Sequence, residues 1–323
     1  MGKFLAAISF AGLLALPVKA FGFDLQLPLL CEFGKNCWIQ QYADHDPSAG
    51  TTDYMCSSET YDGHDGTDFR VPNVTSDVAV IAAAAGVVLA IRDGVDDRLA
   101  STPELITAVS KIECGNGVLI RHEDGFETQY CHMKKGSVIA KAGDRVEAGA
   151  ILGKVGYSGA AAFPHLHLSV RRNGEKLDPF SGPNSQDCHA APHSLWAPAA
   201  AQALAYQPAS LMNLGWADGP VSPELLDQGS LANFTPTLIA PALVGYARLI
   251  NLKKADELIL AVSGPGGEVA ANKQTVDHDK AQFMLFAGKK IHADWQAGIY
   301  RLKIDVLREG KSILSQTSDA EVK

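Results

Sequence analysis

The sequence predicts a mainly β protein with two β domains. Between residues 78 and 171, seven short apolar runs are separated by Gly and Asp, which is typical of a compact antiparallel β domain. Residues 300–306 alternate apolar and charged side chains at every step, as a strand with one face on a core does. Only residues 102–110 in the first domain are predicted to be helical, with Thr102 as the N-cap and Pro103 in the first turn.

The chain is long enough for two cores, since it has 323 residues and is 46% hydrophobic. Residues 1–20 contain an early Lys, an apolar run and a Val-Lys-Ala ending, so we expect a signal peptide and an exported protein, periplasmic or secreted. No later apolar run reaches the roughly 18 residues that span a bilayer, so we expect no membrane span after signal removal. The formal net charge of −8 argues against a nucleic-acid partner, because phosphate binding needs clustered Lys and Arg. We expect a monomer.

The N-terminal extension, residues 21–57, carries three cysteines and the acidic run Asp44-His45-Asp46. Such a run can bind a metal, but a solvated loop is favoured because no further ligands follow at loop spacing. We expect the extension to pack on the domain that follows it, residues 58–182. Whether it covers a groove of that domain stays open at this point.

Six cysteines in the mature chain favour disulfides, because exported proteins keep such bonds. A cysteine metal site is disfavoured, since no Cys-x-x-Cys occurs. Cys114 and Cys131 flank a predicted hairpin that brings them near each other, so their bridge is the one that the sequence supports best. We expect Cys37–Cys56 as the second bridge after Cys114–Cys131. By elimination, the third expected bridge is Cys31–Cys188.

Residues 183–232 are rich in Pro, Ala, Ser and Asn, and we interpret them as a linker or irregular segment. Residues 233–323 contain about six or seven short β-like runs separated by turn signals such as the Gly-Pro-Gly-Gly of 264–267. This spacing favours a small immunoglobulin-like β-sandwich. The region offers no catalytic cluster, because its histidines are isolated.

The first domain contains a candidate metal centre. His165 and His167 are one residue apart in a β-like run, so both imidazoles point to one face. His64 and Asp68 are four apart in a Gly-rich loop that can fold both side chains onto one metal. His132 is a third histidine site. A catalytic zinc site takes three protein ligands and leaves a position open, so five candidates leave two groups for chemistry.

These motifs resemble peptidase family M23, the zinc peptidases that include lysostaphin and the LytM-type endopeptidases. The His-x-x-x-Asp of His64 and Asp68, the Tyr-x-His that ends at His132 and the His-x-His of His165 and His167 occur in the family's order. The similarity runs from about residue 61 to residue 179. It implies a LytM-type catalytic domain in which His64, Asp68 and His167 hold one zinc ion, while His132 and His165 border the open coordination position.

The resemblance also implies a reaction. Zinc makes water a nucleophile near neutral pH, and the two remaining histidines do the acid and base work, with their individual roles left open. The sequence has no His-Glu-x-x-His and no Gly-x-Ser-x-Gly, so a glutamate base and a serine hydrolase are disfavoured. The implied activity is an endopeptidase that cuts peptide cross-links of bacterial peptidoglycan.

Two alternatives stay open. One is a secreted protease that acts on glycine-rich or other proteins. The other is a non-catalytic regulator of cell-wall hydrolases, which is disfavoured because all five metal and catalytic residues are present. The C-terminal sandwich could bind wall, bind a substrate protein or cap the catalytic domain.

The chain departs from the family pattern in three places. Residues 160–163 (Ala-Ala-Ala-Phe) stand where small polar residues are usual, which makes that rim more apolar. Met133 replaces the common Leu, a change that conserves volume. Cys131 lies inside the Tyr-x-His motif, and we expect its disulfide to anchor His132.

Overall fold

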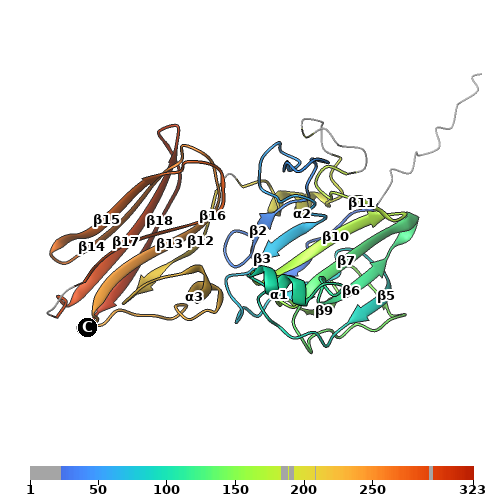
Figure 1. Cartoon of the computed structure of the whole chain (residues 1–323), viewed down its shortest axis with the longest axis horizontal. Helices are drawn as coiled ribbons and strands as arrows, with labels where there is room; N and C mark the ends of the chain where they lie inside the picture. Colours follow the sequence, from blue (N-terminus) through green and yellow to red (C-terminus); the bar gives the residue numbers. More distant parts are fainter. Residues whose placement is uncertain (1–22, 183–187, 189–192, 208, 291–293) are drawn as a thin grey trace, which may run out of the picture.

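The computed structural model describes residues 23–182, 188, 193–207, 209–290 and 294–323. The predicted signal peptide lies outside these residues. The described residues form two β bodies that lie side by side along the long axis (Figure 1). No helix in the described part of the chain has the length and hydropathy needed to cross a membrane.

The first body is built on a large antiparallel sheet. Its strands are β2 (Trp38–Gln41), β3 (Thr67–Arg70), β5 (Gly86–Arg92), β6 (Asn116–Arg121), β7 (Phe126–Met133), β8 (Arg145–Val146), β10 (His165–Arg172) and β11 (Glu175–Leu177). The strand order is β2-β3-β10-β7-β6-β5-β8, and β11 also pairs with β10. The strand β10 therefore lies in the middle of the sheet, between β3 and β7.

A smaller sheet lies against the large one. It consists of β1 (Leu29–Leu30), β4 (Ala79–Ile81) and β9 (Ile151–Lys154), in the order β1-β4-β9. The first core is formed by apolar side chains of both sheets, including Val80, Leu152, Leu166 and Leu168, all fully buried. Because strand side chains alternate, Leu166 and Leu168 face this core, and His165 and His167 face the other way.

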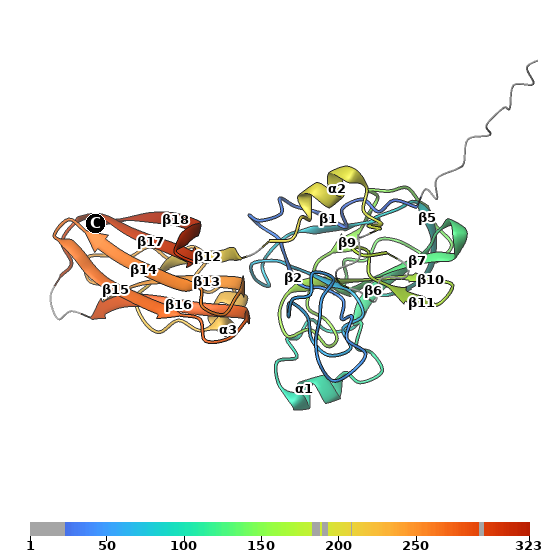
Figure 2. The same ribbon diagram turned by 90° about the horizontal axis from the view of Figure 1, so that it is seen from above.

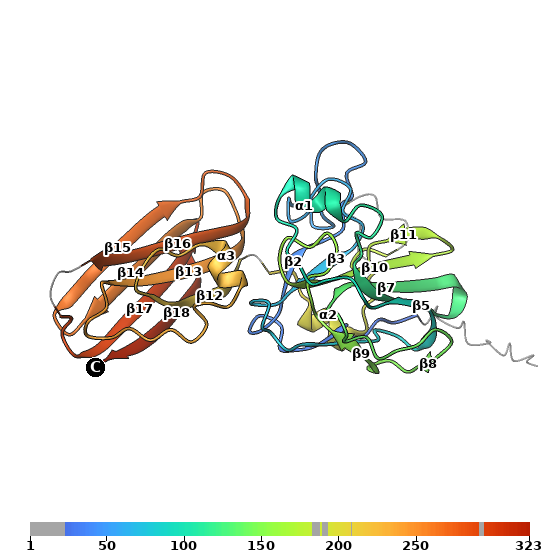
Figure 3. The same ribbon diagram turned by 60° about the horizontal axis from the view of Figure 1, so that its bottom comes forward.

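Short helices complete the chain: α1 (Pro103–Ala108), the 3-10 turn η1 (Glu123–Gly125), α2 (Pro198–Ala203) and α3 (Pro223–Asp227). The predicted cap of α1 is confirmed, since the Leu105 amide donates to the Thr102 hydroxyl. Figures 2 and 3 show α1 beside the loop that follows β2. Both segments therefore rise on the same side of the large sheet.

The second body is a sandwich of two antiparallel sheets with its own core. Its strands are β12 (Ser210–Ala217), β13 (Ala242–Leu252), β14 (Glu257–Gly264), β15 (Gly267–Thr275), β16 (Lys280–Lys290), β17 (Gly298–Arg308) and β18 (Lys311–Val322). One sheet has the order β12-β13-β16 and the other β15-β14-β17-β18. The alternation predicted for residues 300–306 is confirmed, because Tyr300, Leu302, Ile304 and Val306 are buried in this core. The predicted mainly β fold with an immunoglobulin-like sandwich is confirmed.

Two stretches contribute more structure than their composition suggested. The N-terminal extension supplies β1 and β2, so it is part of both sheets of the first body. The stretch 183–232 contains α2, α3 and β12, and β12 pairs with β13 over most of its length. The chain therefore enters the sandwich earlier than residue 233.

One of the three expected disulfides is confirmed and two pairings were wrong. Cys114–Cys131 forms as expected. The expected Cys37–Cys56 and Cys31–Cys188 pairs are replaced by Cys31–Cys37 and Cys56–Cys188. The Cys31–Cys37 bridge has a local cause. The amides of Lys35 and Asn36 donate to the Glu32 carbonyl, so the chain doubles back and the Cα atoms of the two cysteines lie 6.2 Å apart.

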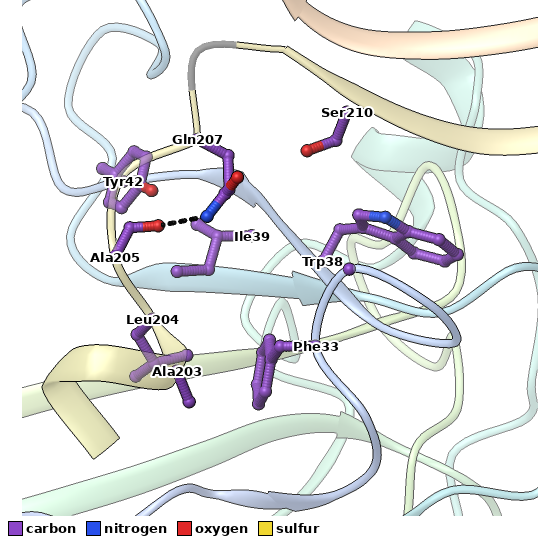
Figure 4. A pocket seen from close by; sticks show the side chains of 10 residues that line it. Phe33, Trp38, Ile39, Tyr42, Ala203, Leu204, Ala205, Gln207 and Ser210 are labelled. Carbon is purple, nitrogen blue, oxygen red and sulfur yellow. Dashed lines mark hydrogen bonds between the residues drawn. The ribbon is translucent and has the colours of Figure 1, made fainter. Parts of the chain in front are cut away.

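The two bodies meet through polar contacts and a small cavity. Buried Arg70 of β3 is 2.8 Å from the Asp227 carboxylate of the sandwich, and Lys253 of the sandwich is 3.1 Å from Glu59. Beside them, β2, α2 and the segment that leads to β12 enclose a cavity of about 140 Å³ (Figure 4). Trp38 forms part of its wall. The bodies are thus joined across the β2 edge of the large sheet.

Candidate metal centre

Three side chains converge on one point above the large sheet. His64 Nε2 lies 3.2 Å from Asp68 Oδ1, His167 Nδ1 lies 2.9 Å from the same oxygen, and the two ring nitrogens are 3.1 Å apart. Their ligand atoms all lie within 4.8 Å of one another. The register explains the meeting, because Asp68 of β3 is paired with His167 of β10 and opposite residues share a face. The arrangement can hold a metal ion.

Each imidazole in this group has a partner on its other nitrogen. His64 Nδ1 donates to the Tyr42 carbonyl over 2.6 Å, which leaves Nε2 with a free lone pair. His167 Nε2 is 2.9 Å from Ser169 Oγ and 3.2 Å from Asp65 Oδ1, which leaves the lone pair on Nδ1. Such partners fix the tautomer and ring orientation of metal-binding histidines. Both free lone pairs point to the Asp68 carboxylate, so the donor set fits a divalent cation.

His132 and His165 lie beside this group. Their rings are 4.6 Å apart, and His165 Nε2 is 3.5 Å from Asp68 Oδ1. Burial and the neighbouring imidazoles hold the pKa of His132 well below its usual range, and burial lowers the pKa of His165. Each donates Nδ1–H to a carbonyl, His132 to Ser158 and His165 to Phe163. Both are therefore neutral near pH 7, with Nε2 able to accept a proton.

The backbone at His132 is strained. Its φ is 61°, in the left-handed region that a residue with a Cβ rarely adopts. Cys131 is bonded to Cys114, and the His132 amide donates to the Cys114 carbonyl over 2.8 Å. Strain of this kind persists where the surroundings determine it, often at functional sites. The expected anchoring of His132 by the disulfide agrees with these contacts.

Gly66 lets two parts of the site approach each other. A Cβ at this position would lie 2.5 Å from the Leu168 carbonyl oxygen and 2.7 Å from His167 Nε2. A larger residue would therefore push the loop between His64 and Asp68 away from β10. The Gly-rich character of this loop is a steric requirement of the site.

A groove of about 330 Å³ passes over the site. It is lined by Tyr61, Asp65, Glu113, Cys114, Gln129, Cys131, His132, Ala160, His167, Ser169 and Arg171. A second hollow of about 510 Å³ lies on the other side of His64, where the Asp44-His45-Asp46 run forms one wall. That run is a loop, but it is not solvated throughout, since His45 Nε2 lies 2.7 Å from Asp178 Oδ2 and both side chains are nearly buried. Its Asp44 carboxylate accepts from the Gly63 amide next to His64. Among the described residues, the N-terminal extension therefore borders this second hollow.

The structure brings together all five residues predicted for the site. It adds partners that the sequence reasoning missed: the carbonyls of Tyr42, Ser158 and Phe163, and the side chains of Asp65 and Ser169. Ser169 could have been found, because it is two residues beyond His167 on the same strand face. The carbonyl partners carry no side-chain signal, so nothing in the sequence pointed to them.

Comparison with known proteins places this site in a family. The profile of peptidase family M23 matches residues 62–179, a stretch that contains His64, Asp68, His132, His165 and His167. Residues 62–179 form a peptidase family M23 domain. The matched stretch thus contains the ligand-like cluster and both neighbouring histidines.

Curated relatives match a limited part of this chain. A DD-carboxypeptidase/endopeptidase Mpg of Neisseria meningitidis serogroup B is 42% identical over 67 residues, which cover 21% of this chain and 15% of that protein. The peptidoglycan DD-endopeptidase ShyC of Vibrio cholerae is 38% identical over 65 residues, covering 20% of this chain and 14% of that protein. The chain therefore spans about a seventh of the length of these relatives.

Among solved structures, the catalytic domain of the M23 protein EnpA from Enterococcus faecalis is similar at 29% identity. The match covers 43% of this chain and 95% of that domain, with a TM-score of 0.30. An M23 peptidase structure from Pseudomonas aeruginosa matches at 33% identity, over 36% of this chain and 41% of the other, with a TM-score of 0.27.

Proposed function

We propose that this chain is an exported zinc-dependent endopeptidase that hydrolyses peptide cross-links of bacterial peptidoglycan. The observation that carries the proposal is the convergence of His64, Asp68 and His167 on one point, with two neutral imidazoles beside it in an open groove. Three protein ligands and an open side are the arrangement of a catalytic metal site. A closed structural site would recruit a fourth protein ligand.

Two imidazoles and one carboxylate favour zinc as the metal, because zinc accepts both nitrogen and oxygen ligands in a small tetrahedral site. When bound, zinc supplies Lewis-acid chemistry that activates water near neutral pH and polarises a carbonyl. We assign His64, Asp68 and His167 as its ligands. The Tyr42 carbonyl, Ser169 and Asp65 keep the two ligand imidazoles in the orientation that this requires.

We assign proton transfer to His132 and His165. Each ring is held by a carbonyl at Nδ1, so Nε2 is the atom that takes a proton from the attacking water and later returns it to the leaving amine. Once protonated, the same Nε2–H can donate to the oxyanion that develops on the scissile carbonyl. Which of the two histidines holds the proton first stays a prediction to be tested.

The substrate proposal is supported by the relatives, which are a DD-carboxypeptidase/endopeptidase and a peptidoglycan DD-endopeptidase. Export is supported by the three disulfides and by the signal peptide predicted for residues 1–20. Wall peptides outside the cytoplasm are then within reach of the groove.

The proposal is tested by mass analysis of the products from isolated peptidoglycan and from a denatured protein, incubated side by side with the purified chain. We expect cleaved cross-links in the first sample, about one zinc per chain, and loss of hydrolysis in the His64→Ala variant. Cleavage of the protein alone would move the substrate to the protease alternative. Full wall cleavage by a metal-free sample or by His64→Ala would contradict the proposal.

A further inference from the structure

We propose that Arg70 is a positioning residue that connects the C-terminal sandwich to His165, which makes the sandwich part of the catalytic unit. This inference rests on the proposed function, because it uses the role assigned to His165. It gives the sandwich a task within the active site itself. The contacts run from Asp227 through Arg70 and Phe163 to His165.

The first contacts lie around Phe163. Arg70 of β3 is paired with His165 of β10, so both side chains stand on the groove face of the sheet. The Arg70 guanidinium carbon lies 4.4 Å from the centre of the Phe163 ring, and that ring lies 4.5 Å from the His165 ring. Phe163 thus lies between the cation and the imidazole. Its carbonyl also accepts from His165 Nδ1 over 2.7 Å, so a shift of Phe163 would turn His165.

The guanidinium is held from the sandwich side. Arg70 Nη2 donates to Asp227 Oδ1 over 2.8 Å, and Nη1 donates to Gln282 Oε1 of β16 over 2.6 Å. Within the first body, Nη1 also donates to Gln40 Oε1 over 3.0 Å. The side chain is only 2% exposed. A planar guanidinium with donors fixed in this way has one orientation, and two of its three side-chain acceptors belong to the sandwich.

Asp227 is itself fixed within the sandwich. It ends α3, which Figure 1 shows on the side of the sandwich that faces the first body. Arg248 of β13 is fully buried; it donates Nη1 to Asp227 Oδ1 over 2.6 Å and Nη2 to the Pro72 carbonyl over 2.9 Å. Pro72 follows β3 closely, so this second arginine also joins the sandwich to the strand that carries Arg70. One carboxylate therefore orients two buried cations at the junction.

A second interface contact offers a matched control. Asp279 of the sandwich accepts from Ser58 Oγ over 3.0 Å and lies 3.5 Å from Lys253 Nζ. Like Asp227 it is a carboxylate that crosses the junction. It contacts Ser58, at the start of the first domain, and Lys253 of the sandwich, and neither residue belongs to the contacts that run from Asp227 to His165. Asp279→Asn should therefore weaken the junction and leave His165 in place.

The test compares Asp227→Asn with Asp279→Asn in the full chain. We expect Asp227→Asn to lower kcat on a soluble cross-linked wall peptide about tenfold to a hundredfold, with KM unchanged, because the imidazole is misplaced. Zinc content should match that of the control. In a protein labelled with 15N-histidine, the Nδ1 proton of His165 should exchange with water about tenfold faster in Asp227→Asn, because its hydrogen bond opens more often.

Gln282→Ala is a second variant that removes an uncharged acceptor of Arg70, and it serves if Asp227→Asn does not fold. Equal kcat and equal proton exchange in Gln282→Ala, Asp227→Asn and the control would overturn the inference while the proposed function stands. If the unmodified chain cleaves no wall peptide, the proposed function fails. The exchange rate of the His165 proton then still decides whether Arg70 positions that ring.

Discussion

The imidazole of His64 donates from Nδ1 to the carbonyl oxygen of Tyr42 over 2.6 Å. Tyr42 follows β2, so a residue of the N-terminal extension sets the orientation of a proposed metal ligand. Asp44, two residues after Tyr42, reinforces this contact, since its amide donates to the His64 carbonyl and its carboxylate accepts from the Gly63 amide. The extension thus supports the metal centre from behind.

We predict that Asp44→Ala weakens zinc binding about tenfold, because loss of a partner behind a metal ligand typically costs tenfold to a hundredfold in affinity. The Gly63 amide would lose its acceptor, and the loop that carries His64 would loosen. A competition titration with a chromogenic chelator measures the affinity. Asp46→Ala is the control, since its carboxylate accepts from the Ser48 amide within its own loop. Equal zinc affinity in the two variants would contradict this prediction.

The Cys114–Cys131 disulfide is predicted to affect both stability and turnover. Replacing both cysteines by Ala should lower the free energy of unfolding by about 3 kcal/mol, the value for a loop of similar length. It should also lower kcat, because the left-handed backbone of His132 loses its covalent neighbour. Zinc should stay bound, since no ligand is changed. Denaturant unfolding, zinc analysis and kinetics on one preparation measure the three quantities.

The matched control removes the Cys31–Cys37 bridge, which closes a short loop far along the chain from His132. That double variant should lose stability and keep the kcat of the folded fraction. If both double variants keep their kcat, the disulfide does not position His132.

Glu59 gives the protein a predicted pH dependence of stability. Its carboxyl is 2% exposed and faces Lys253 of the sandwich, with Asp53 and Tyr206 close by. Burial raises the pKa of Glu59 to about 7, against the opposing effect of Lys253. The folded chain therefore keeps this proton at pH values where the unfolded chain has lost it. Stability should fall as the pH rises from about 4.5 to about 7, by about 3 kcal/mol for this group.

Glu59→Gln removes the titrating group and keeps its shape. The free energy of unfolding of the variant, measured in urea at pH values between 4.5 and 7.5, should rise relative to that of the unmodified chain across this range. Two curves that stay parallel would show that the Glu59 carboxyl does not titrate between the folded and unfolded states as argued.

Much of the site could be predicted from local patterns. The two-residue spacing of His165 and His167 on a strand places both rings on one face, and β10 confirms this. The glycines around His64 indicated a loop that runs into a strand, and β3 begins at Thr67. These features depend on neighbours in the sequence, so periodicity and turn residues contain them.

The remaining features depend on contacts between distant segments. The partners of the ring nitrogens are backbone carbonyls from separate loops, and a carbonyl has no residue-type signature. β15 has a weak sequence signal, because its residues are largely exposed and alternate weakly. Elimination could not assign Cys56 to Cys188, since their approach depends on how the extension packs across a separation of 132 residues.

The most direct test of the account measures zinc content and peptidoglycan hydrolysis in His165→Ala and His167→Ala. The geometry places His167 Nδ1 among the ligand atoms and His165 beside them. We predict that His167→Ala loses zinc and hydrolysis together, whereas His165→Ala loses hydrolysis and keeps about one zinc per chain. Hydrolysis at the unmodified rate by His165→Ala, or zinc-loaded and active His167→Ala, would contradict the account.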